Sequence, residues 1–62
     1  MHIMKLQVAH HVVKLYYPNG RLKELIEYDP EGLKHGQHLQ YLEDGQLDIV
    51  HFYDKGILIS TL

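Results

Sequence analysis

The residues of this 62-residue chain best suited to chemistry are its six histidines. Imidazole nitrogens bind zinc and other transition metals and exchange protons near neutral pH. His35 and His38 lie around a turn in the segment HGQH, whereas His10 and His11 are adjacent and would point to opposite faces of a strand. Neither pair has a carboxylate at a convincing metal-site spacing, and cysteine is absent. The sequence therefore predicts no metal centre, and the histidines are interpreted as half-buried strand and turn residues.

Catalytic side chains are also sparse. Ser60 and Thr61 are the only serine and threonine, and they lie at the C-terminal end, outside any Gly-x-Ser-x-Gly or P-loop motif. A carboxyl pair could join Glu24 to Glu27 or to Asp48, but Glu24 is predicted to face Lys14 in a cross-strand ion pair. A thin sheet of this size also offers no deep pocket that would exclude water. We therefore predict that the protein is not an enzyme and needs no cofactor.

Composition excludes several other classes. Six Lys and Arg against eight Asp and Glu give a net charge of -2, without the basic stripe of a nucleic-acid-binding protein. The apolar runs are too short to span a membrane, and the segment MHIMKLQVAHH does not resemble a signal peptide. We expect one cytoplasmic domain over residues 1–62 that contacts neither nucleic acid nor membrane. A chain this short buries only about 60% of its unfolded surface, so the fold is expected to need oligomerisation, a partner or a metal.

The elements that position these residues follow from the turn signals. In YPNG, Pro18 suits the first position of a type I turn, and Gly20 can take the left-handed conformation that closes a three-residue loop. The same loop is predicted at EDG and DKG. The predicted fold is all-β, a single antiparallel meander sheet of five to six strands. These strands lie near residues 3–9, 11–17, 21–28, 36–42, 46–53 and 57–61. Whether the first two are one bent strand or two stays open, and a helix over LKELIEY is the rival to the third.

These loops also predict which side chains share a face of the sheet. The predicted core face collects Tyr16, Leu22, Ile26, Tyr28, Leu39, Tyr41, Leu47, Ile49, Tyr53, Ile57 and Ile59. The opposite face is the predicted partner-binding surface, with Val13, Leu15, Tyr17, Leu25, Leu42, Val50, Phe52 and Leu58. One sheet cannot bury two apolar faces by itself, and aromatic side chains on such a patch are typical of interfaces. Either a partner or the N-terminal strand is expected to cover the second face.

The stretch YYPNGRLKELIEYDPEG, from Tyr16, recurs in outline 25 residues later as YLEDGQLDIVHFYDKG. This pattern resembles the MORN-type repeat, in the variant of bacterial antitoxins of toxin-antitoxin systems. The resemblance covers about two-thirds of the chain and none of residues 1–13, with only two copies where a solenoid usually needs three. It implies two β-hairpin repeats, at about 14–36 and 37–59, and a binding protein without shared catalytic residues.

The last predicted strand, ILIST, has no charge and no proline, so its edge is expected to be open to pairing. It would suit a homodimer through the C-terminal edge strand or strand addition to a partner. The predicted function is that of a small protein that docks on a larger protein and inhibits it. That partner would be a toxin or, for a phage protein such as an anti-CRISPR, a bacterial defence enzyme. The alternatives are a self-assembling structural repeat and a histidine-dependent metal-binding protein.

Overall fold

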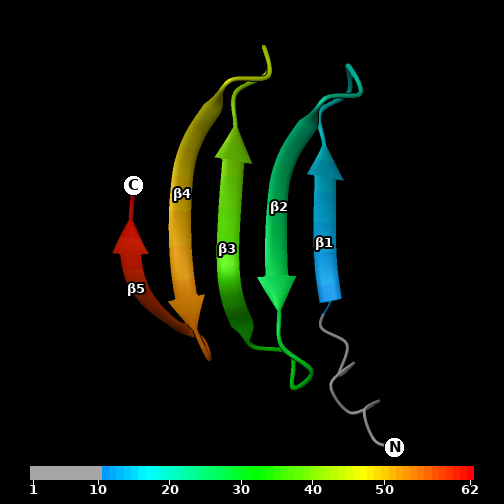
Figure 1. The fold of residues 1–62 in the computed structure, drawn as a ribbon. Helices are drawn as coiled ribbons and strands as arrows, with labels where there is room; N and C mark the ends of the chain where they lie inside the picture. Colours follow the sequence, from blue (N-terminus) through cyan, green and yellow to red (C-terminus); the bar gives the residue numbers. More distant parts are fainter. Residues whose placement is uncertain (1–10) are drawn as a thin grey trace, which may run out of the picture.

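The computed structural model describes residues 11–62, which form one open antiparallel meander in the order β1-β2-β3-β4-β5 (Figure 1). The strands are β1 (His11–Tyr16), β2 (Leu22–Tyr28), β3 (Lys34–Tyr41), β4 (Leu47–Asp54) and β5 (Ile57–Thr61). This confirms the predicted all-β meander, and LKELIEY is strand β2 rather than a helix. The strand predicted near residues 3–9 lies outside the described residues.

Three of the four connections are the same five-residue turn. In the first, Gly20 N donates to Tyr17 O at 2.9 Å and Tyr17 N donates to Arg21 O at 2.8 Å. The same two hydrogen bonds recur in the turns at residues 29–33 and 42–46. Gly20 has a φ of 90°, the left-handed conformation that closes a type I turn with a bulge. The three-residue loops predicted at YPNG and EDG are therefore confirmed.

The fourth connection differs from the prediction. Asp54 pairs with Ile57, so the loop contains only Lys55 and Gly56, with φ angles of 47° and 88°. Positive φ at both central residues is the type I′ hairpin turn, whose twist matches that of the flanking strands. The three-residue loop predicted at DKG is wrong, and Tyr53 pairs with Leu58 instead of Ile57.

The β1-β2 turn (residues 17–21) and the β3-β4 turn (residues 42–46) lie at the top of Figure 1, and we call them the upper turns; the β2-β3 and β4-β5 turns are the lower turns. A register shift next to each upper turn makes the observed strand pairing differ from the predicted one. Tyr16 pairs with Leu22 as predicted, but Leu15 pairs with Glu24, so Lys14 lies opposite Leu25 and not opposite Glu24. The extra residue falls at Lys23 in β2. An equivalent shift in the second hairpin adds Asp48 to β4, so that Tyr41 still pairs with Leu47 while Leu39 pairs with Val50. Because each bulge adds one residue, the residues that follow it in β2 and β4 lie on the face opposite to the one predicted for them.

The observed register sorts the side chains into two faces. We call the first the leucine face, since it contains the aligned residues Leu25, Leu39 and Val50. Its apolar members are Val12, Tyr16, Leu22, Leu25, Leu39, Tyr41, Leu47, Val50, Phe52 and Ile57, and its polar members include Lys14, Glu27 and Gln37. We call the second the histidine face, because His38 pairs there with His51. It also contains Val13, Leu15, Glu24, Ile26, Tyr28, Gln40, Ile49 and Tyr53.

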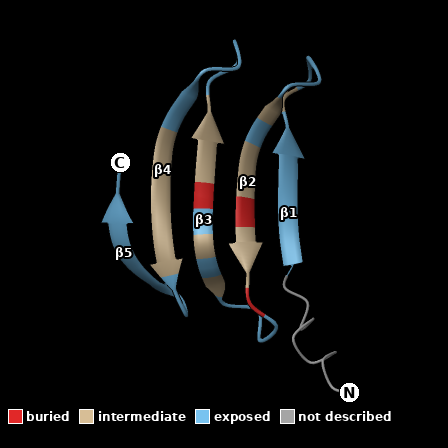
Figure 2. Cartoon of the chain, viewed as in Figure 1, coloured by how far each residue is buried: buried red, intermediate tan, exposed pale blue. Residues whose placement is uncertain are grey.

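The core of the described sheet is thin. Ile26 is the one apolar side chain among residues 11–62 that counts as buried, at 8% exposure, and beside it on β3 His38 is 7% exposed. Figure 2 shows the buried positions on β2, on β3 and in the turn that follows β2, where Asp29 lies. Apart from Ile26, the apolar side chains on both faces are half-buried or exposed within this part of the chain.

Candidate protein-binding surfaces

The predicted division between core face and partner-binding face is wrong beyond each bulge. Five predicted core residues lie together on the leucine face, namely Tyr16, Leu22, Leu39, Tyr41 and Leu47. Four others lie on the histidine face, namely Ile26, Tyr28, Ile49 and Tyr53. The sequence contained no signal for the extra residues Lys23 and Asp48, because neither is a glycine or proline.

The residues predicted to bind a partner are likewise divided between the two faces. Leu25, Val50 and Phe52 lie on the leucine face, whereas Val13 and Leu15 lie on the histidine face. The others occupy turns or the edge: Tyr17 and Leu42 begin the two upper turns, and Leu58 lies on β5 opposite Tyr53. The structure thus brings them together as two smaller groups rather than one patch.

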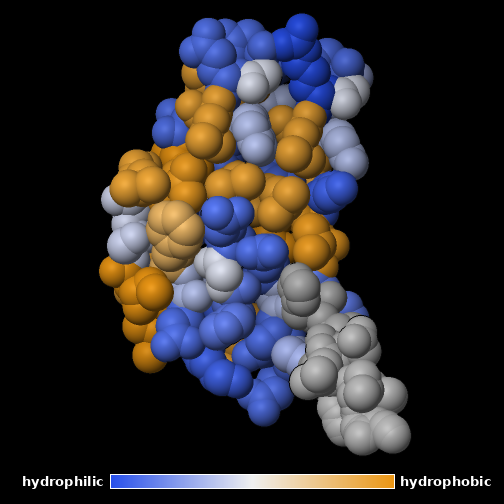
Figure 3. Space-filling view, in the orientation of Figure 1, coloured by the Kyte–Doolittle hydropathy of each residue, from blue (hydrophilic) through white to orange (hydrophobic). Residues whose placement is uncertain are grey.

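The leucine face is the more apolar surface. Its rim is open to water, with Tyr16 57% exposed, Leu47 52% and Val12 45%. Figure 3 shows one face of the molecule, on which apolar side chains gather over the upper and middle parts of the strands while hydrophilic ones lie below. Contiguous apolar patches of more than a few hundred Å² are rare on monomeric proteins and mark contact surfaces.

The histidine face combines polar and apolar groups. At its centre His38 Nε2 lies 2.9 Å from Glu24 Oε1, which joins β3 to β2. The ring of His51 stacks on that of Tyr53 with an interplanar angle of 2°, and the His38 and His51 ring centroids are 5.7 Å apart. Val13 and Leu15 border this group along β1 and are exposed. A mixed surface with aromatic rings is typical of interfaces between proteins that also exist separately.

The histidines do not converge with other ligands. Among residues 11–62 no three His, Asp or Glu side chains are placed to hold one metal ion. His51 Nδ1 contacts the Thr61 hydroxyl at 2.8 Å, and His38 Nδ1 is buried without a hydrogen-bond partner in the described chain. His35 lies elsewhere, in contact with the β4-β5 turn. The histidine side chains therefore make strand-to-strand and turn contacts.

The first upper turn is fastened to the second by side chains. The Tyr17 hydroxyl donates to Tyr41 O at 2.7 Å, and Asn19 Nδ2 donates to Glu43 O at 3.2 Å. Arg21 Nη1 also donates to the Asp44 carbonyl oxygen. The predicted partner-binding residue Tyr17 therefore uses its hydroxyl to join the two hairpins.

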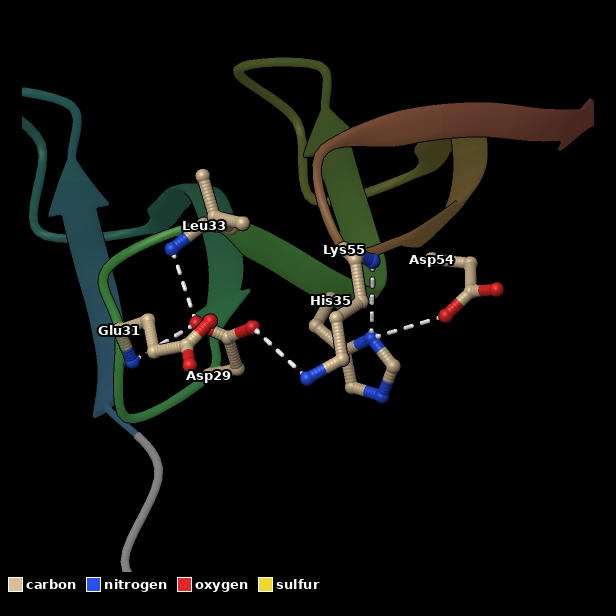
Figure 4. Close-up of polar contacts among 6 residues, drawn as sticks. All are labelled: Asp29, Glu31, Leu33, His35, Asp54 and Lys55. Atoms are coloured by element: carbon tan, nitrogen blue, oxygen red, sulfur yellow. Dashed lines mark hydrogen bonds and ion pairs between the residues drawn. The ribbon is translucent and has the colours of Figure 1, made fainter.

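A polar cluster joins the two lower turns in a similar way (Figure 4). Asp29 Oδ1 accepts hydrogen bonds from Glu31 N and Leu33 N, both at 2.9 Å. These bonds, the one from Leu33 N first, hold the pKa of Asp29 below its usual value, against the opposing effect of burial. Asp29 Oδ2 lies 3.7 Å from Lys55 Nζ in the β4-β5 turn. The carboxylate thus organises its own turn and attracts the neighbouring one.

The neighbouring turn is held by two further hydrogen bonds. Lys55 N donates to His35 Nδ1 at 3.1 Å, and Gly56 N donates to Lys34 O at 2.7 Å. His35 Nδ1 is also 3.4 Å from Asp54 Oδ1. These contacts join the turn after β2 to the β4-β5 turn, so we assign this cluster to the framework that aligns the hairpins, with Asp29 Oδ2 buried and without a hydrogen-bond partner in the described chain.

Residues 11–62 form no pocket. No helix in this part of the chain could cross a membrane. Comparison with protein-family models, with curated proteins and with solved structures found no match to the chain.

Proposed function

We propose that this protein is a non-enzymatic binding module that docks on a larger protein and inhibits it by covering a functional surface. The observation that carries the proposal is the exposure of apolar side chains on both faces of a single-layer sheet. A sheet buries a face by packing it against a second layer. The absence of a pocket among residues 11–62 supports contact with another macromolecule over enclosure of a small substrate.

The histidine face is the docking surface in this proposal. Its stacked rings of His51 and Tyr53 supply rigid aromatic contact area, and Val13 and Leu15 supply exposed apolar contacts beside them. The MORN-like pattern supports a toxin as the partner, in a bacterial cytoplasm. A defence enzyme in a phage-infected cell would be bound through the same contacts, with inhibition by steric blockade.

Affinity capture from the native host tests this proposal with two neighbouring substitutions on β1. Leu15→Asp places a charge on the histidine face, whereas Lys14→Asp changes the opposite face of the same edge strand. We expect the wild type and Lys14→Asp to retain the same partner and Leu15→Asp to lose it, with circular dichroism spectra that remain alike. Equal retention by both variants, or no specific protein bound by the wild type, would rule the docking surface out.

A further inference from the structure

The second face points to a different partner. We propose that two copies of this chain pack leucine face against leucine face, as a two-layer β-sandwich related by a two-fold axis. This inference does not depend on the proposed function, because it uses the opposite side of the sheet. The histidine faces would form the two outer surfaces of the dimer.

The composition of the two faces supports this assignment. Ten apolar side chains lie on the leucine face, including the aligned row Leu25, Leu39 and Val50 across three central strands. The same face also carries Lys14, Glu27 and Gln37. The other face carries Glu24 and His38 at its centre. In β-sandwiches the inward-facing side chains are apolar and the outward-facing ones are mixed. Interfaces of obligate homodimers are likewise more apolar than those of separable partners.

The area of the face is sufficient for a stable dimer. Each strand residue covers about 16 Å² of sheet, from a rise of about 3.4 Å and a strand spacing of about 4.8 Å. The five described strands therefore present a face of roughly 550 Å² in projection. Two such faces together remove about 1,100 Å² from water even before the relief of the side chains is included, which exceeds the roughly 1,000 Å² expected of a biological interface.

The shape of the face also fits a second copy. Residues 11–62 form no pocket, and a second copy offers a sheet of the same size that can pack face to face with the first. A two-fold axis between the faces makes the contact self-complementary and closed, and covers both apolar faces with one interface.

The alternative contact between copies, through the edge of β5, has a structural obstacle. Phe52 pairs with Ser60 and Tyr53 with Leu58, so Ile59 is an extra, bulged residue in the edge strand. Bulges in edge strands disturb the row of backbone groups that another strand would use. The homodimer through this edge stays a prediction, and the bulge favours the face over the edge.

Cysteine cross-linking tests the face directly, because the natural chain has no cysteine. Leu39 lies in the middle strand near the predicted axis, and its neighbour Gln40 points to the other face. With a short bis-maleimide that spans the roughly 10 Å between packed sheets, we expect Leu39→Cys to give a covalent dimer and Gln40→Cys to remain uncoupled. Coupling through Gln40→Cys, with none through Leu39→Cys, would overturn the proposed face.

Sedimentation of the full chain gives the second measurement. We expect the wild type to sediment as a dimer at tens of micromolar, and Phe52→Asp to sediment as a monomer or to lose its fold. The matched change Ile49→Asp lies on the histidine face of the same strand and should leave the protein dimeric. A folded wild type that sediments as a monomer over this range would refute the dimer regardless of how the variants behave.

Discussion

Asp29 shows how a single residue can organise this small sheet. Its side chain is almost completely buried in the turn after β2, and one of its oxygens accepts two backbone N–H bonds. The aspartate stabilises the turn because it replaces water as the acceptor for these groups. Its second oxygen lies near Lys55 on the next turn. One carboxylate therefore links two turns that are far apart in sequence.

Replacing this residue should destabilise the protein. We expect Asp29→Ala to lower the midpoint of urea unfolding clearly, because two backbone donors lose their acceptor. The matched control is Asp54→Ala, whose side chain is 63% exposed and should change the midpoint much less. Equal shifts for the two variants would show that the Asp29 hydrogen bonds do not stabilise the turn.

The same carboxylate should make stability depend on acid pH. The pKa of Asp29 is lowered in the folded chain, mainly by the hydrogen bond from Leu33 N. Its contribution is therefore complete above the unfolded value of about 3.9 and is lost as the pH falls through the lower folded value. Urea midpoints measured from pH 6 to pH 2 should fall less steeply for Asp29→Asn than for wild type. Parallel curves would contradict this assignment.

At the scale of elements, the stability of the sheet depends on contacts between hairpins. The side chains of Tyr17, Asn19 and Arg21 on the β1-β2 turn all donate to backbone carbonyls of the second hairpin, at the end of β3 and in the β3-β4 turn. The corresponding residues one repeat later are Leu42, Asp44 and Gln46. The leucine side chain has no hydrogen-bond donor. The second hairpin therefore cannot make the same three contacts to a further hairpin.

Two adjacent tyrosines allow a controlled test of this contact. Tyr17→Phe removes the hydroxyl that donates to Tyr41 O and should cost about 0.5–1.5 kcal/mol of unfolding free energy. Tyr16→Phe is the control, because the Tyr16 side chain is 57% exposed and should change stability by less than about 0.5 kcal/mol. Chemical denaturation of both variants gives the comparison. A larger loss of unfolding free energy for Tyr16→Phe than for Tyr17→Phe would show that the hydrogen bond of the Tyr17 hydroxyl is not the stabilising contact.

Elements were also the level at which sequence reasoning worked best. Glycine after asparagine in YPNG and after aspartate in EDG predicted two of the turns correctly, because only a few backbone conformations close such a loop. The register was harder to predict. Lys23 and Asp48 are ordinary strand residues, and their insertion as bulges depends on pairing across the sheet. The sequence therefore predicts Ile26 and Leu39 on one face of the sheet, whereas the structure places them on opposite faces.

For the molecule as a whole, the unusual property is how little apolar surface the described chain buries. Ile26 is its one buried apolar side chain, and the described strands all belong to one layer. A single layer leaves the hydrophobic contribution to folding incomplete, since that contribution follows the apolar area removed from water. Stability should therefore depend on what covers the faces.

This dependence leads to a concentration test. If folding and dimerisation are coupled, the urea midpoint rises with protein concentration, and each tenfold increase adds about 1.4 kcal/mol of apparent stability per dimer. Unfolding followed by tyrosine fluorescence between 1 and 100 µM, about two decades, should show this rise for the wild type. A midpoint independent of concentration would indicate that the chain folds alone.

The one-way contact between the upper turns also bears on mutational tolerance. Tyr17, Asn19 and Arg21 donate through their side chains, whereas Glu43 accepts through its main-chain carbonyl. Every amino acid carries that carbonyl. A saturation-mutagenesis screen should therefore accept many replacements at Glu43 and few at the three donors. The turn of the first repeat should thus tolerate fewer substitutions than the corresponding turn of the second repeat.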